Sequence, residues 1–262
     1  MYTKDDLIKC LWNMGLTGRE AIMIHSSMKA IGEVEGGADT VVDALMEFFG
    51  EGLLMTPTHT WAQMSAEYAT FDPKTEPACV GIIPNTFMKR KGVVRSLHPT
   101  HSIAAYGKIA EEYIRGEENA TTPCPPGGCW DRLGKIGAKI LLLGVTHTRN
   151  TFIHSVDEAM GLKDRLTDEP TLMHIVMPDG TIKNVQMYRH FNRILGTGSF
   201  SDRFDKMRKA FEENGVAKDV KFADADCILC DAAGIFEVCK KLFTIEPDCV
   251  MTRDFIPENW WK

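Results

Sequence analysis

Hydrophobic residues along this chain follow two alternating patterns, one typical of helices and one of buried strands. Helical spacing predicts a helix capped by Thr3 and further helices over 41–49 and about 150–160. Short, continuously apolar runs predict strands at 21–24, 53–55 and 139–145. Strands that are apolar on both faces and alternate with helices are typical of a sheet covered by helices on both sides.

The C-terminal part of the chain continues this alternation after one interruption. The turn Pro178-Asp179-Gly180 separates two strand-like runs and predicts a β-hairpin over 172–187. A helix over 202–214, a strand over 227–230 and a helix over 232–242 follow. No repeat or low-complexity linker divides the chain. We therefore expect a single domain over 1–262, a three-layer α/β/α sandwich with a central mostly parallel or mixed sheet and an inserted hairpin.

Composition and charge exclude several classes of protein. The 262 residues are 44% hydrophobic and 25% charged, which is typical of a globular protein. A formal charge of -6 without a basic run argues against nucleic acid as a partner. No apolar window approaches the roughly 20 residues that span a bilayer, and the polar start is unlike a signal peptide. Eight cysteines without such a signal predict reduced thiols in the cytoplasm.

Polar groups follow each of the three apolar strands, where ligands bind in sheets of this class. Just beyond the third strand, His154 lies three and four residues before Asp157 and Glu158, so both carboxylates share its helical face. A carboxylate on one ring nitrogen orients an imidazole as a general base. The alternative is a surface histidine among helix-stabilising charges.

Two segments could bind phosphate. The segment 95–102 holds an arginine, two histidines and three hydroxyls, and arginine suits forked contacts with phosphate. The segment 26–32 lies between a strand and a helix and could offer backbone N–H groups. Neither matches the P-loop or dinucleotide fingerprints. The alternative is that 95–102 is simply a polar loop.

A metal site is not expected. Cys227 and Cys230 have C-x-x-C spacing, but on a strand their thiols would point to opposite faces. Cys124 and Cys129 could add a second pair, although free cysteine is a common core residue. A metal cluster of strand-end histidines at 25, 59 and 147 lacks an anchoring H-E-x-x-H or H-x-E motif.

Several short motifs occur in a fixed order over about residues 20–190. They are MIHSSMKAIG at 23–32 with Gly36-Gly37, MTPT at 55–58, FDP at 71–73, RSLHP at 95–99 with Ser102, LLLGV at 141–145, NTxxH at 150–154, and Arg189-His190. In this combination the chain resembles the aminoglycoside 3-N-acetyltransferase family.

The resemblance implies a three-layer α/β/α domain that binds acetyl-coenzyme A and acetylates the 3-amino group of an aminoglycoside's deoxystreptamine ring. It implies that His154 is the catalytic imidazole. The family commonly has Glu three residues after this histidine, where this chain has Asp157, so either Asp157 or Glu158 could orient the ring. It also implies a coenzyme A site at Ser26, Ser27, Met28, Lys29, Ala30, Ile31, Gly32, Arg95, Ser96 and His98.

An imidazole base suits this chemistry, because an amine must lose a proton when it attacks a thioester. Thr151 is a candidate donor to the oxyanion. Without a G-x-S-x-G elbow, direct transfer is favoured over an acyl-enzyme. A polycationic acceptor would suit Glu67, Asp72 and Glu158, with Trp61 as a cation–π wall. Another amine as acceptor, or a coenzyme A- or metal-binding protein without transferase activity, stays open, as does the oligomeric state, a homodimer included.

Overall fold

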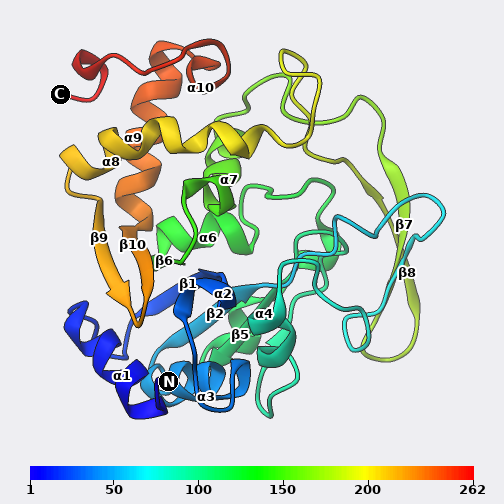
Figure 1. Cartoon of the computed structure of the whole chain (residues 1–262). Coiled ribbons are helices and arrows are strands. Elements are labelled where there is room, and N and C mark those ends of the chain that lie inside the picture. The colour runs from blue at the N-terminus through cyan, green and yellow to red at the C-terminus, as the bar shows by residue number, and fades with distance from the viewer.

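The computed structural model describes all 262 residues and is built on a seven-stranded sheet (Figure 1). The strands lie in the order β4-β5-β2-β1-β6-β10-β9. Their bounds are β1 Ala21–Ser26, β2 Leu53–Pro57, β4 Val94–Arg95, β5 Ile103–Gly107, β6 Lys139–Leu143, β9 Ala217–Phe222 and β10 Ala225–Asp231.

The three strands predicted at 21–24, 53–55 and 139–145 form the centre of this sheet. β1 pairs in parallel with β2 on one side and with β6 on the other. All other pairings in the sheet are antiparallel, so the sheet is mixed. Because β1, β2 and β6 are parallel, their carboxyl ends meet at one edge, which confirms the expected convergence of their polar ends.

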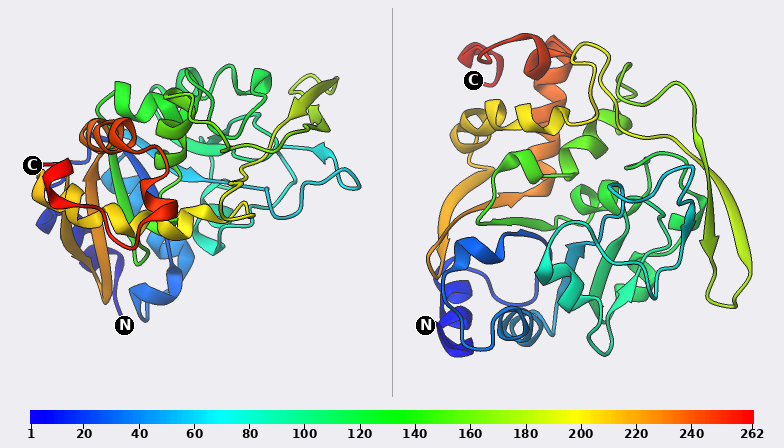
Figure 2. Two further views of the ribbon diagram at one scale, coloured as in Figure 1. Left: turned by 90° about the horizontal axis from the view of Figure 1, so that it is seen from above. Right: turned by 45° about the vertical axis from the view of Figure 1, so that its right-hand side comes forward.

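Helices pack on both faces of the sheet (Figure 2). Alternate residues of one strand enter different cores: Met23 joins a cluster of 36 buried residues and Ile24 one of 22. The smaller cluster includes residues of α1 Lys4–Asn13, α3 Ala38–Phe48 and α4 Ile82–Phe87. The larger includes residues of α5 Ala110–Tyr113, α6 Cys129–Lys135, α7 Phe152–Ala159, α8 Arg208–Glu213, α9 Ala232–Ile245 and α10 Cys249–Thr252. No helix is long and apolar enough to cross a bilayer.

Local sequence signals explain where the first helix begins and ends. Thr3 and Asp6 form a reciprocal capping box at the start of α1, as the predicted cap requires. Gly15 follows the helix with φ +84°, a left-handed conformation that favours glycine.

A second, three-stranded sheet projects to one side of the main sheet (Figure 1). β7 Thr171–Val176 and β8 Ile182–Met187 pair antiparallel, and β3 Thr70–Phe71 pairs with β7. Seven buried residues, including Phe71 and Met173, form a small core beneath it.

The C-terminal part differs in detail from the sequence-based expectation. The single helix expected over 202–214 is a 3-10 helix, η3 Phe200–Met207, followed by α8. β9 was not predicted, because only the two end residues of its sequence AKDVKF are buried. The remaining short helices are α2 Met28–Ile31, η1 Glu117–Asn119, η2 His147–Arg149 and η4 Glu258–Trp260.

Gly144 lets the chain just after β6 approach α2. Its φ is +67°, and an added Cβ would lie 2.3 Å from the Cβ of Ala30. Gly137 has a similar φ of +63° but no atom within 4 Å of an added Cβ. We expect Gly137→Ala to cost about 1 kcal/mol of unfolding free energy, from backbone strain alone.

Gly144→Ala should cost about 1–3 kcal/mol more than Gly137→Ala, because it adds a steric clash to the same strain. Urea denaturation of both variants measures the difference. Equal losses of unfolding free energy in the two variants would show that Ala30 can move away from the added methyl group at no measurable cost in stability.

Candidate active site

A cavity of about 810 Å³ opens at the carboxyl ends of the three parallel strands. Ser26 is the last residue of β1, His59 lies just beyond β2, and Thr148 lies just beyond β6. The opposite wall comes from α7 and from the segment 189–202. The strand-end histidine His147 does not line it, because its ring packs 4.9 Å from that of Phe211.

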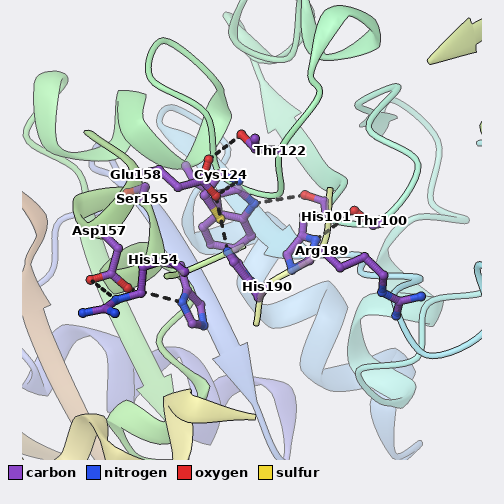
Figure 3. A network of polar contacts seen from close by, with 12 residues as sticks. Thr100, His101, Thr122, Cys124, His154, Ser155, Asp157, Glu158, Arg189 and His190 are labelled. Carbon is purple, nitrogen blue, oxygen red and sulfur yellow. Dashed lines mark hydrogen bonds and ion pairs between the residues drawn. The ribbon is translucent and has the colours of Figure 1, made fainter. Parts of the chain in front are cut away.

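Four imidazole rings lie in a chain along this cavity, and Figure 3 labels three of them, His101, His190 and His154. Ring centroids are 4.7 Å apart for His59 and His101, 5.1 Å for His101 and His190, and 4.0 Å for His190 and His154. Burial lowers the pKa of His59, His101 and His154 well below the usual value, and neighbouring rings lower it further. These three side chains are therefore neutral at pH 7 and can accept protons.

His154 and Asp157 face each other on α7. His154 Nδ1 lies 3.7 Å from Asp157 Oδ2, just beyond hydrogen-bond length, and neither atom has another partner. Arg165 Nε lies 3.9 Å from the other oxygen of Asp157, and all three side chains are nearly buried. Because Nδ1 faces Asp157, the Nε2 side of the ring is left for the cavity that His154 lines.

Asp157 holds its proton more tightly than an ordinary aspartic acid. Burial raises its pKa to about 8, although the nearby guanidinium of Arg165 opposes this shift. The neutral imidazole and the protonated carboxyl form a pair without net charge at pH 7. A proton taken up at Nε2 of His154 would lower the pKa of Asp157, since an imidazolium favours an ionised neighbour.

Glu158 contacts a different imidazole. Its Oε1 lies 3.3 Å from Nε2 of His190 and accepts a 2.8 Å hydrogen bond from the backbone N–H of Cys124. The hydroxyl of Thr122 donates to Oε2. Of the two carboxylates that could orient His154, only Asp157 lies beside it.

Thr151 lies at the start of α7 and lines the cavity. Its hydroxyl is 3.1 Å from Nε2 of His59. A hydroxyl held in this way can donate to an oxyanion if the imidazole accepts no hydrogen from it, so its availability depends on the tautomer of His59.

Of the segment predicted to bind coenzyme A, residues 26–32, only Ser26 lines the cavity, and most of the rest forms the short helix α2. Ser26 lines the cavity, whereas Ser27 directly precedes α2 and its N–H donates to Leu143 O at 2.9 Å. Lys29 is exposed on α2, and Ile31 is buried beneath it. Met28 and Ala30 are half-buried, and Gly32 ends the turn with φ +88°.

Arg95, Ser96 and His98 take up structural positions beside the cavity rather than in its wall. The Arg95 guanidinium donates to the carbonyl oxygens of Thr58, Pro73 and Glu76 and to the Ser102 hydroxyl. The Ser96 hydroxyl accepts from the N–H of Ile103. Nδ1 of His98 accepts backbone N–H groups of Thr100 and His101, while Nε2 faces Thr122 O.

The carboxylates proposed for a cationic acceptor lie elsewhere. Glu67 is exposed outside the cavity wall, and Asp72 accepts from the N–H of Lys74. Trp61 does line the cavity, with 42% of its surface exposed.

The charges in the wall come from residues to which the sequence analysis gave no role in the site, although Arg189 belongs to one of the motifs of the resemblance. They are Arg149, Arg189 and Asp202. Arg149 forms no ion pair, and Arg189 donates to the carbonyl oxygens of Trp61 and Met64. The sequence did contain a signal for Arg149 as a site residue, because it follows the polar end of β6. It contained no such signal for Asp202.

The two cysteines of the C-x-x-C pair point to opposite faces of the sheet, as expected for a strand. Cys227 belongs to one core cluster and Cys230 to the other. Cys124 and Cys129 are buried, and all eight cysteines are unpaired.

Known proteins share this architecture. The sequence model described as "Aminoglycoside 3-N-acetyltransferase" matches residues 23–244. Aminoglycoside N(3)-acetyltransferase IV of Salmonella sp is 33% identical over 156 residues, a match that spans 58% of this chain and 58% of that relative. The solved structure of aminoglycoside acetyltransferase AAC(3)-IVa, as a variant in complex with a gentamicin, has a TM-score of 0.81.

That structure is 25% identical and is aligned over 96% of this chain and 92% of its own. The fold is also that of AAC-IIIb, solved with CoASH, at 21% identity and a TM-score of 0.75 over 91% of this chain and 94% of that one. The family match covers most of the chain and includes the cavity and α7. The chain belongs to the aminoglycoside 3-N-acetyltransferase family.

Proposed function

We propose that this protein is an acetyl-coenzyme A-dependent N-acetyltransferase with His154 as its general base. The observation that carries the proposal is a buried, neutral imidazole that lines a cavity of about 810 Å³ and has a carboxyl group 3.7 Å behind it. Family membership and the likeness to acetyltransferases over nearly the whole chain support it. Eight unpaired cysteines support a reducing, cytoplasmic setting.

The proposed reaction is a direct transfer. The amine nitrogen attacks the thioester carbonyl carbon while Nε2 of His154 takes the proton that the nitrogen loses. The tetrahedral oxyanion accepts a hydrogen bond from the Thr151 hydroxyl. The carbon–sulfur bond then breaks, and the coenzyme A thiolate leaves with the proton that the imidazole returns.

Asp157 supports the charged form of His154 in this scheme. When Nε2 gains a proton, the ring needs a negative neighbour, and the ionised carboxylate of Asp157 supplies one and can accept a hydrogen bond from Nδ1–H. Arg165, with its guanidinium 3.9 Å away, favours the ionised carboxylate.

We assign Ser26 and the α2 turn to the coenzyme A side, and Arg149 to its phosphates, because Arg149 is an exposed arginine without a carboxylate partner.

The 3-amino group of an aminoglycoside is the acceptor that family membership supports. A second candidate is an amine that also carries a carboxylate or phosphate. The wall favours this second acceptor through Arg189, because with Arg149 assigned to the coenzyme the charged groups left for the acceptor are Arg189 and one carboxylate, Asp202. An acceptor with several ammonium groups would need more carboxylates than that.

His154→Ala should lower kcat by at least about 100-fold, because it removes the general base from the chemical step. Acetyl-coenzyme A affinity, measured by calorimetry, should change little. His174→Gln on the exposed part of β7 is the matched control and should keep full activity. Near-normal turnover in His154→Ala would refute the assignment.

Asp157→Asn should reduce kcat more than Glu158→Gln, because Asp157 lies beside His154 and Glu158 contacts His190. The wild-type kcat should rise with pH as Asp157, with its pKa raised to about 8, ionises and strengthens the base. Asp157→Asn should lose that rise. A larger loss of turnover in Glu158→Gln would instead give the orienting role to Glu158.

The charge of the cavity wall gives a test of the acceptor. At saturating acetyl-coenzyme A, we expect an amine with a carboxylate or phosphate to have a higher kcat/KM than gentamicin. The KM of this amine should rise with added salt, because dissolved ions screen its attraction to arginine. The Debye length is about 8 Å at physiological ionic strength. A preference for gentamicin, with a KM that rises with salt, would establish the aminoglycoside instead.

A further inference from the structure

Three metal-ligating side chains from distant parts of the chain meet next to the proposed catalytic histidine. They are Cys124 in the loop before α6, Glu158 on α7 and His190 after β8 (Figure 3). Their sulfur, oxygen and nitrogen ligand atoms all lie within 4.8 Å of one another. The sequence analysis considered Cys124 only together with other cysteines, because nothing in the linear spacing connects it to Glu158 or His190.

Glu158 is a buried carboxylate without a cationic partner. Its side chain is 6% exposed, and no lysine or arginine lies within 4.0 Å; its one candidate charge partner is His190. A buried carboxylate without a cation is costly, and such groups are normally paired or coordinate a metal. Hydrogen bonds from Thr122 and from the Cys124 N–H fix its orientation.

We propose that Cys124 Sγ, Glu158 Oε1 and His190 Nε2 bind one zinc ion. Thiolate, imidazole and carboxylate are the ligands that zinc takes in proteins, and three of them leave a fourth position for water. His190 lines the cavity, so this water would come from the cavity side. The hydroxyl of Thr122 stays on Oε2, as a partner that orients the ligating carboxylate.

Zinc binding would change the charge of the cluster and release a proton. Burial raises the pKa of the Cys124 thiol well above its usual range, so the thiol is protonated before the metal binds. Coordination requires the thiolate, and about one proton per zinc is released near neutral pH. The site would also fix the His190 ring, which stacks at 4.0 Å on the ring of His154.

Calorimetric titration of the purified, metal-depleted chain with ZnCl₂ tests the proposal without any acetyltransferase assay. In two buffers of different ionisation enthalpy, we expect one zinc per chain and the release of about one proton. Cys124→Ser should weaken binding by at least about 100-fold. Cys129→Ser is the matched control, since it removes another buried thiol from the same region and should leave affinity unchanged.

Cobalt(II) gives a second readout that does not depend on the stability of a variant. The wild-type chain with Co²⁺ should show a thiolate-to-cobalt charge-transfer band and the visible spectrum of a four-coordinate ion. Absence of that band, absence of saturable zinc binding, or equal zinc affinity in folded Cys124→Ser would overturn the proposal.

Discussion

Desolvation of imidazole rings is the constraint on which the rest of this site depends. The carboxyl ends of β1 and β2 bring histidines to the cavity, and α7 and the segment after β8 bring two more. Because the rings are packed against each other and against hydrophobic groups, the charged form is unfavourable for His59, His101 and His154. His154, the ring stacked on His190, is therefore kept neutral, which is the state that a general base needs.

The same desolvation gives Asp157 its role. An exposed aspartate would be ionised throughout the neutral range, so the charge beside His154 would not change with pH near neutrality. Burial keeps the proton on Asp157 up to a pKa of about 8, while Arg165 limits how far that shift goes. The pair can then change its charge distribution during the reaction without placing an unpaired charge in the core.

The sequence predicted the central elements well because their signals are local. Thr3 and Asp6 cap the first helix by contacts three residues apart, and the short, continuous apolar runs before Ser26 and Thr146 are typical of buried strands. His154 and Asp157 could be paired in advance, since three residues on a helix place them on one face. β9 was not predicted, and η3 stands where the first part of a longer α-helix was expected. Tertiary packing, and not the local pattern, determines both elements.

The rest of the site depends on contacts between distant segments, which a single sequence does not encode in its spacing. Arg95 had the composition of a phosphate ligand, yet its guanidinium holds the carbonyl oxygens of Thr58 and Glu76, 37 and 19 residues away. The motif Arg189-His190 gave no indication of a place in the cavity wall, and Asp202 had no signal at all; both line the cavity because the segment after β8 folds against it.

Consecutive residues on α7 illustrate how geometry resolves what sequence leaves open. Asp157 and Glu158 are both within a helical turn of His154, so spacing alone cannot choose between them. Side chains of neighbouring helical residues point about 100° apart, and a longer side chain reaches further from the axis. Asp157 therefore remains with the imidazole of its own helix, while Glu158 extends to His190 and the N–H of Cys124. One helix thus supplies a separate carboxyl group to each of two stacked imidazoles, which allows one ring to act as a base while the other is held in place.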